Sequence, residues 1–314
     1  MARRRRGQPV HGWIVLDKPG GMTSTQAVAA VKRLTDAAKA GHAGTLDPLA
    51  TGVLPIALGE ATKTMPFVVD AQKRYRFTVR WGEARSTDDA QGEVTATSAR
   101  RPSRQEILTA LPQFLGTIEQ VPPAFSALKV DGQRAYDLAR AGQTVELAPR
   151  WVRIDRFELV EMPDADHAVF VVACGKGAYM RALCRDLARS LGTLGHLAAL
   201  RRTAVGRFDE SRAISLERLA ALGHSASCPG SLAEAGYLLS VGTALDDIPA
   251  LALTNVEANR LRSGQAVALF HRMDRERVGH LESGSVVCAT SGGKPVALAR
   301  FQEGGLRPLR ILNL

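Results

Sequence analysis

The stretch that organises this 314-residue sequence reads GHAGTLDPLATGVLP and spans residues 41–55. Its three glycines permit backbone conformations that other residues avoid, while Pro48 fixes its own φ and keeps Asp47 out of helical geometry. The pattern therefore predicts a stiff loop that can aim the Asp47 carboxylate outward. Physical reasoning alone gives a more common explanation, in which an aspartate before proline bonds its own backbone in a turn. His42 by itself is still weaker evidence for a functional site.

The segments around this loop predict strands and helices that do not alternate regularly. Upstream, residues 13–16 read as a strand ending in a turn at 17–21, and Thr23 and Gln26 have the spacing of a helix capping box. Downstream, residues 75–81, 151–160 and 168–173 are rich in strand-forming types. Because no βαβ rhythm appears, we expect the α+β class, with a mixed or antiparallel sheet flanked by helices.

Two further helices and a change of composition suggest how the chain is divided. Residues 103–114 begin with a second capping box and carry an apolar set (Ile107, Leu108, Leu111 and Phe114), and residues 178–191 form an amphipathic pattern that places Arg181 on a basic side. After Pro249 a new capped helix and short β-rich runs begin. We expect a basic tail at residues 1–10, a catalytic domain at 11–249 and a small β-rich domain at 250–314.

Composition narrows the classes of partner and compartment. The formal net charge is +10, and 33 arginines outnumber 8 lysines, which favours a polyanionic partner but also fits a codon-usage bias. The four cysteines form no Cys-x-x-Cys pair, so we expect neither disulfides nor structural zinc. No signal-peptide core or membrane-spanning run is present, which predicts a cytoplasmic protein with no membrane contact. The Arg3–Arg6 run either touches phosphates or is a solvated terminus.

The loop and six other segments together resemble one known family. Residues 41–55 match the signature of the TruB family of tRNA pseudouridine synthases, Gly-His-x-Gly-x-Leu-Asp-Pro-x-Ala-x-Gly-x-Leu-Pro, at every fixed position. The other similar segments, in chain order, are residues 17–19, 58–63, 73–76, 122–129, 176–181 and 200–206. The resemblance extends over about residues 13–219 and, more loosely, to a C-terminal piece similar to the PUA-like RNA-binding module of the bacterial members.

The resemblance implies a role for each matching residue. Asp47 matches the catalytic aspartate, Tyr75 the active-site tyrosine that stacks on the target base, and Arg181 the arginine that pairs with the aspartate. Without the resemblance, Tyr75 reads as a core tyrosine of a strand and Arg181 as a surface arginine. The remaining matches are four substrate-side positions: Lys18 as a support, Tyr179 and Leu200 in the pocket wall, and His42 as a histidine that helps to open the T loop.

The implied activity is isomerisation of one uridine to pseudouridine at position 55 in the T loop of tRNA. The base would be flipped out of the loop, detached, turned and rejoined through carbon. Whether the aspartate attacks the sugar or the base, or a glycal forms, stays open. The isomerisation is redox-neutral, so no metal and no organic cofactor are expected. The implied partner is the tRNA T stem-loop, and the enzyme is expected to act as a monomer.

Three other functions compete with this interpretation. A PUA-bearing protein could grip tRNA as a folding chaperone without catalysis, although the intact set of Asp47, Tyr75 and Arg181 argues against that. Another enzyme class is disfavoured because the sequence contains none of the common nucleotide-binding, zinc-protease or serine-hydrolase motifs. A guide-RNA-dependent relative acting on rRNA is disfavoured because no long extension follows the small C-terminal module.

Overall fold

The structure is a computed structural model, and its described residues are 7–126, 129–130, 133–134, 147–225, 229–269 and 276–314. The Arg3–Arg6 run, Cys228 and residues 127–128 of one family-like segment lie outside them. Within the described residues, no helix is long and apolar enough to cross a membrane.

Most of the described chain is built on one nine-stranded mixed sheet. The strand order is β1-β3-β12-β4-β11-β10-β7, with β2 added to β3 and β13 to β12. All neighbours are antiparallel except β12 and β3, which run parallel. The strands are β1 Gly12–Lys18, β2 Ala40–His42, β3 Thr51–Leu58, β4 Lys73–Trp81, β7 Gly116–Gln120, β10 Arg150–Glu161, β11 His167–Cys174, β12 Gly195–Val205 and β13 Phe208–Asp209. The expected mixed sheet is confirmed.

Helices and two small hairpins complete this part of the molecule. Both predicted capping boxes form, at Thr23 with Gln26 and at Ser103 with Glu106. The helical segments are α1 Ser24–Leu34, η1 Gly59–Lys63, α2 Met65–Asp70, α3 Arg104–Ala110, η2 Leu111–Phe114, α5 Met180–Ser190, η3 Glu210–Arg212, α6 Leu216–Ser225, α7 Pro229–Glu234 and η4 Val241–Leu245. The hairpins are β5 Glu83–Arg85 with β6 Val94–Thr97, and β8 Lys129–Val130 with β9 Gln133–Arg134.

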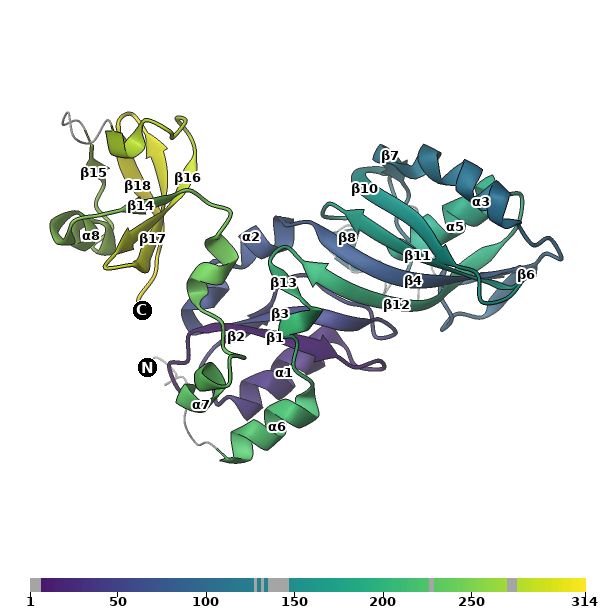
Figure 1. Ribbon diagram of the computed structural model, residues 1–314, viewed down its shortest axis with the longest axis horizontal. Helices are drawn as coiled ribbons and strands as arrows, with labels where there is room; N and C mark the ends of the chain where they lie inside the picture. Colours follow the sequence, from purple (N-terminus) through teal and green to yellow (C-terminus); the bar gives the residue numbers. More distant parts are fainter. Residues whose placement is uncertain (1–6, 127–128, 131–132, 135–146, 226–228, 270–275) are drawn as a thin grey trace.

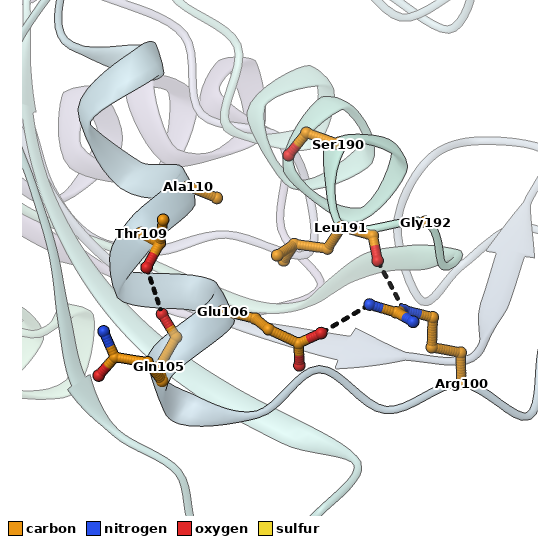
Figure 2. Close-up of a pocket in the computed structure, with 8 residues that line it drawn as sticks. All are labelled: Arg100, Gln105, Glu106, Thr109, Ala110, Ser190, Leu191 and Gly192. Atoms are coloured by element: carbon orange, nitrogen blue, oxygen red, sulfur yellow. Dashed lines mark hydrogen bonds and ion pairs between the residues drawn. The ribbon is translucent and has the colours of Figure 1, made fainter.

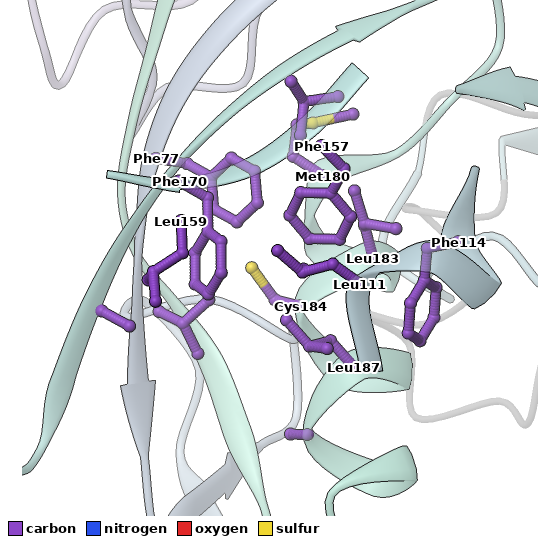
Figure 3. Close-up of a cluster of buried hydrophobic side chains, with 14 of the residues drawn as sticks. Phe77, Leu111, Phe114, Phe157, Leu159, Phe170, Met180, Leu183, Cys184 and Leu187 are labelled. Atoms are coloured by element: carbon purple, nitrogen blue, oxygen red, sulfur yellow. The ribbon is translucent and has the colours of Figure 1, made fainter. Parts of the chain in front are cut away.

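The sheet is covered by helices in two separate places on one side. Helices α3 and α5 lie on β4, β10 and β11, where Phe77, Phe157 and Phe170 pack with Leu183 and Leu187 of α5 (Figure 3). Helices α1 and α6 lie on β1 and β3 over a second apolar cluster that includes Ile14, Leu16 and Leu54 (Figure 1). Two half-buried side chains, Tyr75 and Leu200, pack against both clusters. The two helical layers therefore meet at these residues.

A five-stranded sheet of its own forms the C-terminal part of the chain, at one end of the view in Figure 1. Its order is β14-β16-β17-β18-β15, and α8 covers a separate apolar core. The elements are β14 Ala250–Ala252, α8 Asn255–Arg262, β15 Val267–Ala268, β16 Val286–Ser291, β17 Lys294–Gln302 and β18 Gly305–Ile311. Cys288, Leu298 and Leu312 join Trp13 and Val15 in a third apolar cluster, so the two sheets share a packed interface.

Four expectations about local structure need correction. The segment 41–55 is not a loop throughout, because His42 belongs to β2 and residues 51–55 belong to β3. Leu108 is exposed, because α3 ends at Ala110 and a 3₁₀ turn carries Leu111 and Phe114 into the core instead. Arg181 is not on a solvent face of α5, because its own side chain is buried.

The fourth correction concerns the expected tail at residues 1–10. Its described part is packed, since Gln8 donates from its backbone to Asp36 at 2.6 Å and Val10 is buried. Both residues lie against the end of α1, and the first residues of the fold therefore precede residue 11.

Candidate active site

The loop that carries Asp47 connects β2 to β3 and is fixed by hydrogen bonds on both sides of the aspartate. Before it, the buried Ser24 hydroxyl exchanges two bonds with the backbone of Leu46, at 2.8 and 3.0 Å. After it, the Pro48 carbonyl accepts from the backbone of Gly21 at 2.8 Å. A loop pinned at the residues next to Asp47 holds the carboxylate in one place.

The loop continues into β3, and the second residue of that strand, Gly52, has to be a glycine. It sits at φ +95°, and a Cβ there would lie 2.3 Å from the carbonyl oxygen of Arg202 on the neighbouring strand β12. The third glycine of the segment is therefore required by the close approach of two backbones.

The Asp47 carboxylate forms an ion pair with Arg181, which is distant in the sequence and lies in the first turn of α5. The distance from Arg181 Nη2 to Asp47 Oδ2 is 2.9 Å, and the Asp47 side chain is 40% exposed while that of Arg181 is 5% exposed. Asp47 is therefore no self-bonded turn residue and Arg181 no surface arginine. A carboxylate open to solvent on one side and held by a buried cation on the other can meet a ligand from outside.

Arg181 is itself held by groups that the sequence did not point out. Its guanidinium donates to the carbonyls of Thr87 at 3.0 Å and Phe125 at 2.9 Å, and its Nε lies 3.7 Å from the buried Asp89 carboxylate. Thr87 and Asp89 belong to the turn between β5 and β6. A guanidinium with this many partners has little freedom to leave Asp47.

Tyr75 and Leu200 form the floor where the two helical layers meet. They lie on the adjacent strands β4 and β12, and both are half-buried. Burial raises the pKa of the Tyr75 phenol, with a smaller contribution from the Asp47 negative charge, while Arg202 opposes the rise. The phenol is therefore protonated at neutral pH and lies near enough to Asp47 to sense its charge.

Tyr179 and Lys18 both lie near enough to Asp47 for its charge to affect them. Tyr179 is the N-cap of α5, where its backbone exchanges hydrogen bonds with the buried Gln120 side chain at 2.8 and 3.2 Å. Lys18 is fully buried and donates to the carbonyls of Met22 at 2.7 Å and Pro48 at 3.4 Å. Burial lowers the pKa of Lys18 to about 8, and the Asp47 charge opposes that shift.

His42 lies on β2, one strand before the loop. Burial lowers its pKa, and the positive charge of Arg202 lowers it further. A neutral imidazole is thus favoured at neutral pH. All seven predicted site residues lie either on the loop that carries Asp47 or on helices and strands next to this loop.

Sequence reasoning missed four supporting residues: Ser24, Asp89, Gln120 and Arg202. Each is a buried polar side chain bonded to the backbone or to a charged partner of the site. Asp89 follows a Thr-Asp pair in a polar turn and Arg202 follows another arginine, so neither stands out in one sequence. Nothing local in the sequence indicates that these polar side chains are buried.

Two cavities in the structure lie away from Asp47. One, of about 610 Å³, is an open hollow between α3 and the end of α5, in which Arg100 bridges the Leu191 carbonyl and the Glu106 carboxylate (Figure 2). The other, of about 280 Å³, lies between α2, the β12–β13 turn and η4. In the described residues no group of His, Cys, Asp and Glu side chains could hold a metal ion.

Solved structures with the same fold were found by comparison. The chain superposes with a TM-score of 0.72 and 23% identity on a chain of "Crystal Structure of a Cbf5-Nop10-Gar1 Complex", over 96% of this chain and 85% of that one. A second match, "Structure of H/ACA RNP bound to a substrate RNA containing 2'-deoxyuridine", has a TM-score of 0.72 and 20% identity, over 100% and 92% of the two chains. At these identities the likeness establishes the fold.

Sequence comparison goes further. Residues 32–180 match the description "TruB family pseudouridylate synthase (N terminal domain)" and residues 181–244 match "tRNA pseudouridylate synthase B C-terminal domain". A relative named tRNA pseudouridine synthase B from Bradyrhizobium diazoefficiens is 60% identical over 99% of this chain and 88% of its own length. The protein of that name from Caulobacter vibrioides is 54% identical over the full length of both.

The fold and these matches define a pseudouridine synthase, an isomerase that rearranges uridine within RNA. Within that class, the chain belongs to the TruB family of pseudouridylate synthases.

Proposed function

We propose that this enzyme converts uridine 55 in the T loop of tRNA to pseudouridine, with Asp47 as the catalytic carboxylate. The observation that carries the proposal is the ion pair between the half-exposed Asp47 and the buried Arg181, formed beside Tyr75 at the junction of two helical layers. The names of relatives at 48–60% identity support tRNA as the substrate.

The reaction exchanges one glycosidic bond for another without net loss of atoms. The bond from C1′ to N1 breaks, a bond from C1′ to C5 forms, and one proton leaves C5 while N1 gains one. Breaking the first bond develops positive character at the sugar carbon, which a carboxylate stabilises or traps as in retaining glycosidases. In this proposal Arg181 holds the Asp47 carboxylate aimed at the flipped nucleotide.

The neighbouring side chains then have distinct roles in the proposal. Tyr75 stacks on the flipped uracil, and its protonated phenol can move the proton from the sugar or from C5. Leu200 and Tyr179 wall the pocket, and Lys18 supports the loop from beneath Pro48. His42, on the strand before the loop, takes part in opening the T loop so that the uridine can leave its stack.

We also propose that the C-terminal module binds the tRNA outside the active site. Its own sheet and core support a boundary near Pro249, between η4 and β14, with residues 250–314 as a PUA-like domain and the preceding residues as the catalytic domain. The net charge of +10 suits a polyanionic partner. In this proposal one monomer engages one tRNA.

The test is conversion of an unmodified tRNA transcript, read by carbodiimide-dependent primer extension. We expect one new stop at position 55, and no stop in a transcript that carries cytidine there. The Asp47→Asn enzyme should bind the transcript without modifying it. Conversion only outside the T loop would contradict the proposed substrate. Binding with no conversion by the wild-type enzyme would indicate a tRNA chaperone instead.

A further inference from the structure

Arg202 is a buried cation that donates hydrogen bonds to three backbone carbonyls around the Asp47 loop. The residue is 1% exposed, and its Nε donates to the Val53 carbonyl at 2.8 Å. Its two terminal nitrogens donate to the carbonyls of Gly44 at 3.0 Å and Thr45 at 3.4 Å. One side chain thus joins β12 to the loop just before Asp47 and to β3 just after it.

The charge of Arg202 has no carboxylate to neutralise it among the described residues. Arg201, its neighbour in sequence, points to the other face of the sheet and pairs with Asp17 at 3.0 Å and with Glu210 at 2.5 Å. Removing a guanidinium from water without a counter-ion costs several kcal/mol as a general rule, so an apolar residue of similar volume is often more stable at such a position. The groups that gain from the charge at this position are the three carbonyls that Arg202 bonds.

The groups that Arg202 contacts show what these hydrogen bonds do. Gly44 is at φ +94°, a conformation that its glycine permits and that the bonded carbonyl holds in place. Ser24 fixes Leu46 from the opposite side. The backbone is therefore clamped on either side of Thr45, and the next side chain free to reach a ligand is Asp47. Arg202 also lies directly opposite Tyr75 across β12 and β4.

We propose that Arg202 is a positioning residue. By bonding the carbonyls of Gly44 and Thr45, it holds the loop so that the Asp47 carboxylate lies against Arg181 and the Tyr75 ring. The inference rests on the proposed catalytic role of Asp47. The guanidinium contacts no substrate in this arrangement, because it is covered by the loop that it holds. A hydrogen bond from Arg202 to the phenol, which lowers the pKa of Tyr75 against the effect of burial, is consistent with the same placement.

The experiment compares Arg202→Lys and Arg202→Met with the matched control Arg201→Lys, which makes the same change one residue away on the other face. Lysine keeps the charge but replaces three separated guanidinium nitrogens by a single one, and methionine removes both the charge and the donors. We expect kcat to fall about 10-fold for Arg202→Lys and about 100-fold or more for Arg202→Met, with KM within about 3-fold, as for interactions made through the transition state. Arg201→Lys should stay within about 2-fold.

A double substitution separates positioning from general stability. If Arg202 acts by placing Asp47 against Arg181, the kcat loss of Arg181→Lys with Arg202→Lys should be smaller than the product of the single losses, by about 5-fold or more. Independent multiplication of the two losses would contradict the inference, as would wild-type kcat in Arg202→Lys.

The folded fraction of each variant, measured by circular dichroism at the assay temperature, normalises the rates. Should Arg202→Met not fold, Arg202→Lys decides alone, and a rate loss that only follows its folded fraction contradicts the inference. Failure of the wild-type enzyme to modify position 55 would overturn the proposed substrate. Equal rates of wild type and Arg202→Lys would overturn the role of Arg202 alone.

Discussion

Positively charged side chains are buried on one face of strands β4 and β12 and partly exposed on the other. On the face that carries Tyr75, which we call the Tyr75 face, Lys73 and Arg202 are buried and bonded to backbone carbonyls. On the other, open face, Arg76 pairs with Glu161 at 2.9 Å and Arg201 pairs with Asp17 and Glu210, all of them partly exposed. Ion pairs exposed to water contribute little to stability, whereas buried charges interact strongly with neighbouring groups. The same residue types should therefore matter on one face and not on the other.

The largest expected effect is at Asp47. Asp47→Asn keeps the size of the side chain but removes the anion that we propose to meet the sugar or the base, so kcat should fall at least about 1,000-fold, as when catalytic nucleophiles are removed. Single-turnover rates on the tRNA transcript measure the loss, and filter binding checks that affinity stays within about 3-fold. A variant retaining a tenth of the activity would remove Asp47 from the chemistry.

Arg181→Lys should have the next largest effect. A lysine ammonium cannot hold Asp47 together with the carbonyls of Thr87 and Phe125, because these contacts use the planar guanidinium. We expect a loss of about 100-fold in kcat, equivalent to about 2.7 kcal/mol. The same substitution at Arg76, on the open face, is the control and should change kcat by less than about 2-fold. Similar losses at both positions would break the contrast between the faces.

Lys73 allows the contrast to be measured as stability against pH. Burial lowers its pKa to about 8 from the ordinary 10.5, so the unfolded chain binds this proton more tightly than the folded one. The penalty for charging it is present below pH 8 and is relieved as the pH rises from 8 to 10.5. From pH 7.5 to 9.5 the free energy of unfolding of wild type should therefore rise by about 1–2 kcal/mol relative to Lys73→Met.

Urea unfolding at the two pH values measures that difference. A stability difference between wild type and Lys73→Met that does not change with pH would mean that the Tyr75 face does not penalise the charge.

The smallest effect is expected for Glu161→Gln on the open face. It breaks the ion pair with Arg76, in which the side chains are 46% and 53% exposed. Exposed pairs contribute about 0.5 kcal/mol or less, so the midpoint of urea unfolding and the kcat should both stay close to those of wild type. A loss above about 1.5 kcal/mol would show that the open face is not merely solvated.

The sequence was informative where local rules apply and uninformative where tertiary contacts decide. Two capping boxes and the alternation in residues 75–81 predicted α1, α3 and β4, because these signals arise within a few residues. The contact of Asp47 with Arg181 was implied only by family resemblance, since it joins residues 134 positions apart. The burial of Arg202, Asp89 and Gln120 had no local signal, because burial is created when distant strands come together.

Gly52 has a consequence for anyone who surveys this enzyme by systematic substitution. With a methyl group at that position, β3 and β12 would be forced apart at the place where they first run side by side. An alanine scan would then score Gly52 as an inactivating position, like the proposed catalytic residue Asp47, although glycine supplies no chemistry. Activity maps of this segment need a parallel readout of folding before a lost signal is assigned to the reaction.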